Sequence, residues 1–599
     1  MGNKGDEQDR TRAHHMDVIG ARAEAIAAGA SPMIAQFQAL KRAHPDALLF
    51  FRMGDFYELF FDDAVRAAPA LEIALTKRGR HAGEDIPMCG VPVHNAETYL
   101  HRLIRKGFKV AICEQLEEPA QARKRGGKAL VRRGVVRIVT PGTLTEDALL
   151  PAGRSNFLVA VGMVGSQFGL AWVDISTGAF ATELTDATTL PAALARLDPG
   201  ELLVPERVLR DDSIAQLWRE AGDRLTPLRD NAFDSIAAER SLCRTFKVAS
   251  LDGFGGFARA ELAAAGAILG YLELTQKGLV PRLDSPRRVL PASLMQIDPA
   301  TRRNLELVTS LAGSREGSLL AAIDRTVTSA GARLLADRLA APLARIEPIR
   351  ARLDEVESLV EEMELREAVR ATLKRCPDLS RALSRLALGR GGPRDLLAVA
   401  HGLEHAQALR ALLGNTAVLD SVAGRLEPPE GLAADLLGTL AEETPLLARD
   451  GNFVRPGCHA ELDELRTLRD RSRRHIAALE ERYRRETGIG SLKIRHNSLL
   501  GYFVEVNAGH LAKVPQGFVQ RQSMAGATRF STAELAELES RIASAGERAL
   551  ALELELFETL RQAVIAASNP ISMTAAALAE LDVAAALFHG LSDRSRLAI

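Results

Sequence analysis

An aromatic ring and a carboxylate, Phe56 and Glu58, lie two residues apart in an otherwise apolar stretch of the chain. Residues 48–51 form a short, aromatic-rich run typical of a buried strand, and Gly54 and Asp55 interrupt it. Apolar residues then return with helical spacing, so we expect a strand, a tight turn and a helix start near residue 57. At such a turn the ring and the carboxylate could both project from the protein surface.

A purely structural interpretation fits the same residues. Asp55 would be the N-cap of the helix, Glu58 its capping-box partner three residues later, and Phe56 a core residue. The local pattern favours this interpretation, and only the wider sequence argues for recognition chemistry.

Two other patterns contain residue types used in metal chemistry. His401, Glu404 and His405 match the His-x-x-Glu-His signature of zinc peptidases, in which two imidazoles four residues apart on a helix share a metal. The flanking residues are those of an ordinary packing helix, and no second motif supplies a third ligand. Asp174 ends a predicted strand, but a lone carboxylate does not hold the metal ions of a nuclease. We interpret both patterns as structural.

Positive charge is concentrated locally, although the whole chain has 76 Lys and Arg against 77 Asp and Glu. Residues 31–140 contain 18 basic and 12 acidic residues, and residues 466–530 contain 13 and 5. Between residues 119 and 145 there are seven basic residues and no acidic one: Arg123, Lys124, Arg125, Lys128, Arg132, Arg133 and Arg137. These regions could follow nucleic-acid phosphates or could simply be solvated.

The composition is that of a globular protein with several domains. At 599 residues the chain is too long for one core and should hold about four domains of roughly 150 residues each. Its five cysteines include no Cys-x-x-Cys pair, which argues against a disulfide framework or a cysteine zinc site and fits a reducing cytoplasm. No apolar run approaches about 18 residues and no apolar signal sequence begins the chain, so we expect no membrane span.

The first half of the chain predicts two α/β regions. Strands and helices alternate from Ser31, an expected helix N-cap, to about residue 118. Three successive strands then follow, with Gly165 and Ser166 as a two-residue hairpin turn. The strands are expected at residues 157–164, 168–174 and 179–184.

The second half predicts long helices with one β-rich insertion. After about residue 251 the apolar spacing and the Ala-rich composition fit long packed helices. Strands are expected at residues 492–495, 502–506 and 518–522. Ser531 and Glu534 then form a capping box that opens another long helix. Two helices should therefore carry a small sheet at their tip.

Several motifs, in this order, resemble the bacterial MutS family of mismatch-repair proteins. In the first part of the chain they are LLFFRMGDFYELFF (48–61), IALTKRG (73–79), IPMCGVP (86–92), VAICEQ (110–115) and VRIVTPGT (136–143). In the helical part they are MQIDPATRRNLEL (295–307), GSLL (317–320) and DRTVTSAGARLL (324–335). Long motifs in the same order make the resemblance specific, and it covers nearly all of the chain.

The resemblance assigns roles to the opening residues. In the family, a Phe wedges into the duplex and stacks on a mispaired base while a Glu hydrogen-bonds to that base; these roles fall to Phe56 and Glu58. Entering a base step costs a few kcal/mol, least where pairing is faulty, and stacking recovers about 1–3 kcal/mol with almost any base. The carboxylate would disfavour ordinary duplex, where no base donates to it. Met53 and Met88 are further candidates for the mismatch-binding surface.

The resemblance also implies a fold class: a multidomain α/β and α protein with a small mixed α/β N-terminal domain, a ribonuclease-H-like connector, and a long helical core and lever with an inserted β-rich clamp. The expected parts are a mobile tail (1–30), a mismatch-binding domain (31–118), a basic linker (119–150), the connector (151–250), the helical core and lever (251–465), the clamp (466–545) and the returning lever helices (546–599).

Partners and DNA contacts follow from the same resemblance. In the family the connector contributes to docking the repair partner MutL, and the clamp closes around the duplex through backbone contacts. The candidates for DNA-backbone contacts are Arg78, Arg123, Lys124, Lys128, Lys493, Arg495, Arg521 and Arg529.

MutS proteins also carry a C-terminal ATPase domain with a phosphate-binding P-loop. This sequence contains no Gly-x-x-x-x-Gly-Lys-Ser/Thr motif, and its nearest match, residues 126–129, lacks the first glycine and the hydroxyl. We therefore expect no cofactor in this chain; ATP and Mg²⁺ serve the family through that domain. Because the family dimerises largely through the same domain, self-association of this chain stays an open question.

The sequence thus predicts recognition of mispaired or looped bases in duplex DNA at the start of mismatch repair, by a cytoplasmic, nucleoid-associated protein that is not itself an enzyme. One alternative is a structural clamp for DNA junctions, like the MutS relatives used in recombination, but residues 54–58 argue against it. The other is a nuclease or zinc hydrolase, which the lack of clustered carboxylates and of a complete metal set opposes.

The missing P-loop motif generates a first prediction. Titration of the purified chain with ATP and Mg²⁺ in a calorimeter should give no saturable binding, because no loop cradles the phosphates. Nucleotide should also leave the affinity for DNA unchanged. Saturable, Mg²⁺-dependent ATP binding would show that this interpretation of the motif is wrong.

Overall fold

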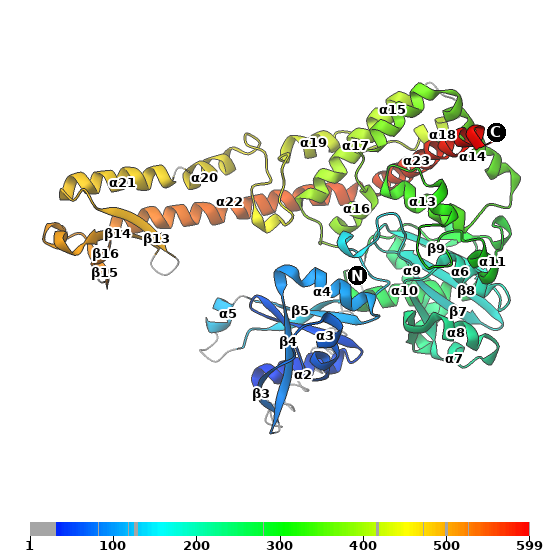
Figure 1. Cartoon of the computed structure of the whole chain (residues 1–599), viewed down its shortest axis with the longest axis horizontal. Coiled ribbons are helices and arrows are strands. Elements are labelled where there is room, and N and C mark those ends of the chain that lie inside the picture. The colour runs from blue at the N-terminus through cyan, green and yellow to red at the C-terminus, as the bar shows by residue number, and fades with distance from the viewer. Residues whose placement is uncertain are drawn as a thin grey trace. The chain divides into compact units, whose positions relative to one another are not determined.

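The computed structural model describes residues 31–81, 83–117, 119–124, 130–279, 281–414, 419–470, 472–497, 501–524 and 526–597 (Figure 1). The predicted tail, residues 1–30, lies outside the described residues. The chain divides into two compact units, which we describe separately. The first unit comprises Met1–Arg390, His405–Pro428 and Asn569–Ile599, and the second comprises Gly391–Glu404 and Pro429–Ser568.

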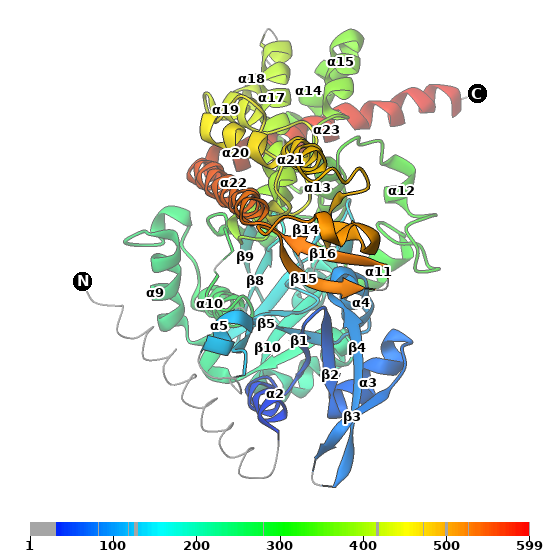
Figure 2. The same cartoon turned by 90° about the vertical axis from the view of Figure 1, so that its left-hand side faces the viewer.

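The first unit begins with a six-stranded sheet in the order β3-β4-β2-β1-β5-β6. The strands are β1 (Ala47–Met53), β2 (Phe56–Phe60), β3 (Thr76–His81), β4 (Glu84–Pro92), β5 (Lys109–Gln115) and β6 (Arg133–Val139). Helix α2 (Pro32–Ala43) packs on one face, and α3 (Phe61–Leu71) and α4 (Ala96–Arg105) pack on the other (Figure 2). As predicted, Ser31 caps α2, since its hydroxyl accepts from the backbone N–H of Ile34 at 3.4 Å.

The predicted helix start at residue 57 is wrong, because Phe56–Phe60 is strand β2 and the helix begins only at Phe61. β1 and β2 form a hairpin whose turn contains Gly54, with a φ of 61° that favours glycine. Antiparallel pairing with both β1 and β4 overrides the apolar spacing that suggested a helix. Asp55 is therefore no N-cap, and Glu58 belongs to no capping box.

The basic linker predicted for residues 119–150 is also different in the structure. Residues 119–124 form the short helix α5 (Pro119–Lys124), and residues 133–139 form β6, which pairs antiparallel with β5. A register shift in the pairing with β5 interrupts the two-residue alternation of β6, so that Val135 packs on the α2 face of the sheet and Val139 on the other. Without a regular alternation, the many charges of the segment predicted a linker.

A second sheet has the order β11-β10-β7-β8-β9-β12. Its strands are β7 (Leu158–Val164), β8 (Gln167–Asp174), β9 (Ala179–Thr185), β10 (Glu201–Pro205), β11 (Leu225–Leu228) and β12 (Arg287–Val289). The predicted three-stranded meander is confirmed, with Gly165 at the first hairpin. The helices of this region are α6 (Leu190–Leu197), α7 (Glu206–Leu209), α8 (Ala215–Ala221), α9 (Ser235–Phe246) and α10 (Arg259–Thr275).

Strand β12 belongs to this sheet and helix α10 packs on it, although the sequence pattern predicted both as parts of the helical core. β12 pairs with β9, and α10 packs directly on β7 and β8. The approach is close: a Cβ at Gly169 would lie 2.2 Å from the backbone of Ala260, so only glycine lets the helix lie this near. The connector region therefore extends past its predicted end at residue 250.

Apart from a small sheet in the second unit, the rest of the described chain is mainly helical, as expected. The helices are α11 (Pro299–Asn304), α12 (Leu319–Ile323), α13 (Ser329–Ala340), α14 (Ile346–Glu361), α15 (Met363–Leu373), α16 (Leu379–Ala387), α17 (Pro393–Leu413), α18 (Asp420–Ala423), α19 (Leu432–Thr439), α20 (Ala460–Asp470), α21 (Ser472–Thr487), α22 (Ala533–Ala566) and α23 (Ser568–Leu597).

A buried carboxylate on α23 holds the start of α13. Asp582 accepts hydrogen bonds from the backbone N–H of Val327 at 3.0 Å and of Thr328 at 2.8 Å, and from the Thr328 hydroxyl at 2.6 Å. A Cβ at Gly331 would lie 2.2 Å from an oxygen of Asp582. These contacts explain Thr328 and Gly331 of the motif at residues 324–335.

The second unit contains the predicted small sheet carried by two helices, in the order β13-β14-β16-β15 (Figure 1). Its strands are β13 (Lys493–Asn497), β14 (Gly501–Asn507), β15 (Val519–Met524) and β16 (Ala527–Ser531). The sequence pattern did not predict β16 and placed the cap of α22 at Ser531. The N-cap is Thr532, whose hydroxyl accepts from the N–H of Leu535 at 3.0 Å.

One stretch of the described helices, Ser568–Leu587 in α23, is long and apolar enough to cross a membrane by composition, with a mean hydropathy of 1.4. Of its most apolar window, 67% is buried in the protein. A mostly buried apolar helix is what the core of a globular protein uses, so this finding is weak evidence for a span.

Candidate nucleic-acid interface

One face of the first sheet collects all four residues predicted to surround a mispair. Along β2 the side chains alternate, so Phe56, Glu58 and Phe60 share a face. Register partners in antiparallel pairs also share a face, which adds Met53 opposite Phe56 and Met88 opposite Phe60. The structure therefore places Met53, Phe56, Glu58 and Met88 on one face, with Met53 beside Phe56 at one end of β2 and Met88 beside Phe60 at the other. Both methionines are partly buried against the core that α2 covers.

The ring of Phe56 is not a core residue. It is 47% exposed and lies at the start of β2, beside the hairpin turn. Phe60, on the same face of the same strand, is fully buried against α2. The fold thus needs the ring at position 60 for packing, whereas the ring at position 56 contributes a half-exposed apolar surface.

Glu58 is 9% exposed and forms an ion pair with Arg78 of β3 through its oxygen Oε1. Its other oxygen, Oε2, is buried and has no hydrogen-bond partner among the described residues. A buried carboxylate oxygen without a donor is uncommon in folded proteins. This acceptor lies on the same face as the exposed Phe56 ring.

Arg133, predicted as a phosphate contact, is instead built into the domain. Its Nε donates to the carbonyl of Arg52 at 2.7 Å, and its guanidinium lies 5.0 Å from the ring centre of Phe51. Burial lowers the pKa of Arg133, and the nearby Cys113 and Glu58 oppose that shift. The residue therefore braces the end of β1 next to Met53.

The other basic residues of this segment differ among themselves. Arg137 is ion-paired with Glu146, whereas Lys124 at the end of α5 and Arg132 are exposed. Arg125 and Lys128 lie outside the described residues, and so does the side chain of Arg123. Lys124 and Arg132 are thus the described members of the segment that a phosphate could reach.

In the second unit, the outer face of the small sheet carries the predicted clamp residues. Val504, Val506 and Phe530 pack inward against the helices. Lys493 and Arg495, two residues apart on β13, both lie on the opposite face of the sheet. Register pairs place Glu505 and Arg529 on that face too. Lys493 and Arg521 are exposed, and Arg495 is half-exposed with Glu505 at 3.3 Å.

Arg529 is held more firmly than the other three. Its guanidinium lies 4.5 Å from the ring centre of Phe503, donates to Gln522 at 2.9 Å and is 3.7 Å from Glu505. These contacts stabilise the sheet, so Arg529 is less available to a phosphate than Lys493, Arg495 and Arg521.

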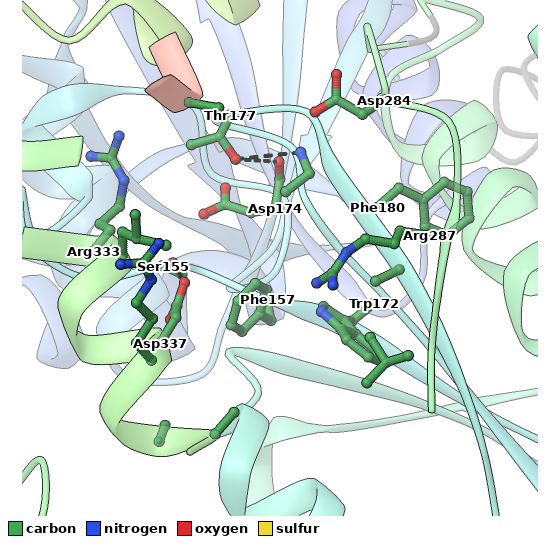
Figure 3. A pocket seen from close by; sticks show the side chains of 18 of the residues that line it. Ser155, Phe157, Trp172, Asp174, Thr177, Phe180, Asp284, Arg287, Arg333 and Asp337 are labelled. Atoms are coloured by element: carbon green, nitrogen blue, oxygen red, sulfur yellow. Dashed lines mark hydrogen bonds between the residues drawn. The ribbon is translucent and has the colours of Figure 1, made fainter. Parts of the chain in front are cut away.

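A cavity of about 730 Å³ in the first unit is a separate candidate site (Figure 3). Ser155, Arg333 and Asp337 lie on one side of it and Trp172 and Arg287 on the other (Figure 3). Arg333 is engaged by Asp378 at 2.6 Å.

Two carboxylates meet near this cavity, which the sequence did not predict. Asp174 accepts from Ser176 N at 2.9 Å within its own turn and from Asn156 N, 18 residues earlier, at 3.0 Å, so both of its oxygens already hold backbone N–H groups. Burial raises the pKa of Asp337 to about 7; Asp174 adds to the shift, and the hydrogen bond from Ser155 opposes it. With a pKa of about 7, the Asp337 carboxyl keeps its proton in about half of the molecules at neutral pH, so this pair does not present the two ionised carboxylates that bind the metals of a nuclease.

The His-x-x-Glu-His pattern also gains no metal site. His401 lies on α17 with its Nδ1 3.5 Å from the Glu404 carboxylate. Among the described residues, no group of three or more His, Cys, Asp or Glu is arranged to hold a metal ion.

Comparisons with known proteins decide the family. Models of MutS domain I, MutS domain II and MutS domain III match residues 31–148, 156–284 and 300–587. The chain is also 54% identical over 583 residues to the DNA mismatch repair protein MutS of Azorhizobium caulinodans, covering 95% of this chain and 62% of that protein. The chain belongs to the MutS family. The resemblance and the multidomain fold class predicted from the sequence are confirmed.

Other MutS proteins match over a similar length. That of Ruegeria pomeroyi is 53% identical over 570 residues, covering 93% of this chain and 64% of the relative. That of Rhizobium meliloti is 52% identical over 575 residues, covering 93% and 62%. The chain therefore spans less than two thirds of the length of these MutS relatives.

The titration of Asp337 generates a stability prediction. Its pKa of about 7 in the fold lies above the ordinary value of 3.8, so the folded protein retains a proton that the unfolded chain releases, and stability falls as pH rises between these values. Asp337→Asn removes this penalty. Its melting temperature relative to wild type should therefore be higher at about pH 8 than at about pH 5.

Asp186 offers a matched control, because its hydroxyl partners lower its pKa to about 2 and it stays ionised over this range. The effect of Asp186→Asn should be the same at both pH values. A pH-independent difference for Asp337→Asn would contradict the protonated state assigned to Asp337.

Proposed function

We propose that this chain recognises mispaired or looped bases in duplex DNA, with Phe56 as the stacking wedge and Glu58 as the hydrogen-bond acceptor. The observation that carries the proposal is the half-exposed Phe56 ring on the same face as a carboxylate oxygen that has no donor in the part of the chain that the structure describes. Membership of a family of DNA mismatch repair proteins supports it.

The energetics of a wedge suit a sensor of many lesions. Inserting the ring into a well-stacked step costs a few kcal/mol, and stacking on the base returns about 1–3 kcal/mol, so ordinary duplex gives little net gain. A mispaired step is already softened, and its unpaired base groups can donate to Glu58. Both terms therefore favour the lesion over ordinary duplex.

Binding strength comes from phosphate contacts in this proposal. The exposed cations Lys493, Arg495 and Arg521 contact the DNA backbone from the small sheet, and Lys124 does so from α5. Such contacts release counter-ions and carry no sequence information, so they position the protein without selecting the lesion.

The wider role follows the family. We propose that the connector region docks a MutL-type partner and that the protein acts in the cytoplasm, associated with the nucleoid. Stacking and hydrogen bonding need no cofactor, so recognition by this chain requires neither ATP nor Mg²⁺. Self-association of the chain is a question for sedimentation or light scattering.

Substitution of Phe56 tests the wedge. Phe56→Ala should reduce the affinity for a G·T duplex by about 1–3 kcal/mol, roughly 5- to 150-fold, with little change for the matched G·C duplex at the same salt concentration. Its melting temperature should stay near that of wild type, because the ring is half-exposed.

Phe60→Ala is the matched control, since that ring lies on the same face but is fully buried. It should cost about 3–5 kcal/mol of folding stability instead. A well-folded Phe56→Ala protein that keeps its full preference for G·T would exclude the wedge and leave the junction clamp as the better account.

Salt dependence tests the backbone contacts. Replacing Lys493, Arg495 and Arg521 with Gln should flatten the slope of log affinity against log salt by about 0.9 for each phosphate that the protein no longer neutralises. Arg529→Gln should mainly lower the melting temperature, because Arg529 is engaged by Glu505, Gln522 and Phe503. An unchanged slope in the triple variant would remove these residues from the DNA interface.

A further inference from the structure

The ion pair between Arg78 and Glu58 joins strands that are not neighbours. β4 lies between β3 and β2 in the sheet, and the β4 residue in register with Glu58 is Gly90. No side chain therefore stands at that position of β4. The Arg78 guanidinium can reach across to Glu58, where its Nη1 pairs with Oε1.

The cations of β3 are divided between two carboxylates. Lys77 and Arg80 both pair with Asp85, at 2.9 Å and 3.1 Å, near the exposed end of the hairpin. Arg78 pairs with Glu58, which is far more buried than Asp85. One arginine of this strand is thus committed to the carboxylate that faces the Phe56 side of the sheet.

This pairing treats the two oxygens of Glu58 differently. Oε1 is held by Arg78, while Oε2 is buried without a donor among the described residues. A carboxylate fixed at one oxygen has little rotational freedom left, so the direction of the other acceptor is set in advance. The positive charge also offsets the repulsion that a bare carboxylate would feel near phosphates.

We propose that Arg78 is the positioning residue for Glu58: it holds Oε1, so that Oε2, which is buried in the free protein, becomes the acceptor for a donor group of a mispaired base once the side chains that cover it move aside on DNA binding. The inference rests on the proposed function and assigns Arg78 a role different from the phosphate contact expected from the sequence. Arg78 then contributes to the preference for G·T over G·C duplex, and it does so only by positioning Glu58.

A double-mutant cycle tests this role. Binding of wild type, Arg78→Ala, Glu58→Ala and the double variant to one G·T duplex and its G·C counterpart is measured at matched salt concentration. Arg78→Ala and Glu58→Ala should each reduce the G·T preference by a similar factor, and the double variant should show no smaller preference than Glu58→Ala alone. Arg78→Lys, which keeps a charge near Oε1, should recover part of the preference.

Arg80→Ala supplies the control for the removal of positive charge from the same strand. Arg80→Ala should either leave the affinity for both duplexes unchanged or reduce both affinities by the same factor. The preference for G·T should stay intact in either case. Thermal melts of each variant separate folding from binding, and Arg78→Lys remains informative if Arg78→Ala unfolds.

An Arg78→Ala protein that weakens both duplexes equally, keeps the G·T preference and is additive with Glu58→Ala would overturn the inference and make Arg78 a phosphate contact. This outcome differs from failure of the proposed function, in which wild type itself shows no preference for G·T. If Phe56→Ala removes the preference and Arg78→Ala does not, only the role of Arg78 falls.

Discussion

The position of β2 between β1 and β4 is the constraint on which the candidate interface depends. Because side chains alternate along a strand, a slip of one residue would move Phe56 and Glu58 to the opposite face of the sheet. The Gly54 turn and the burial of Leu59 and Phe60 on opposite faces hold the register. The same register sets Glu58 opposite Gly90, which leaves room for the pair with Arg78.

Charge in this protein is sorted by local structure and not by composition. Arg133, Arg137 and Arg529 belong to runs that read as nucleic-acid contacts, yet each is engaged by carbonyls, carboxylates or rings within its own domain. Lys124, Lys493 and Arg521 remain exposed. A chain with almost no net charge can therefore still have several exposed cations for phosphates, because only some basic residues of each run are paired within their own domain.

Local signals in the sequence were enough for some elements. The meander β7–β9 and the cap of α2 at Ser31 follow from short-range turn and capping chemistry, and both are confirmed. The helix expected at residue 57 failed because pairing on both sides turned an ambiguous apolar run into a strand. β6 was not predicted because a register shift interrupts its alternation and its charges resemble those of a linker.

The parts of the site that escaped prediction depend on distant residues. Phe56 and Glu58 were proposed from a motif, but the pair with Arg78, 20 residues further along, requires the strand order β3-β4-β2. The meeting of Asp174 with Asp337 likewise requires α13 to lie beside the second sheet. Neither pair of residues has a spacing that a sequence pattern could reveal, because only the tertiary structure brings the two groups of each pair together.

The structure of this chain bound to a duplex with a single G·T mispair tests the central claim most directly. The account predicts the Phe56 ring in van der Waals contact with a base of the mispair, at about 3.5–4 Å. It also predicts Oε2 of Glu58 within hydrogen-bond distance of that base, while Arg78 remains on Oε1. A complex in which the Phe56 ring contacts no base and the mispair stays stacked in the duplex would contradict the account.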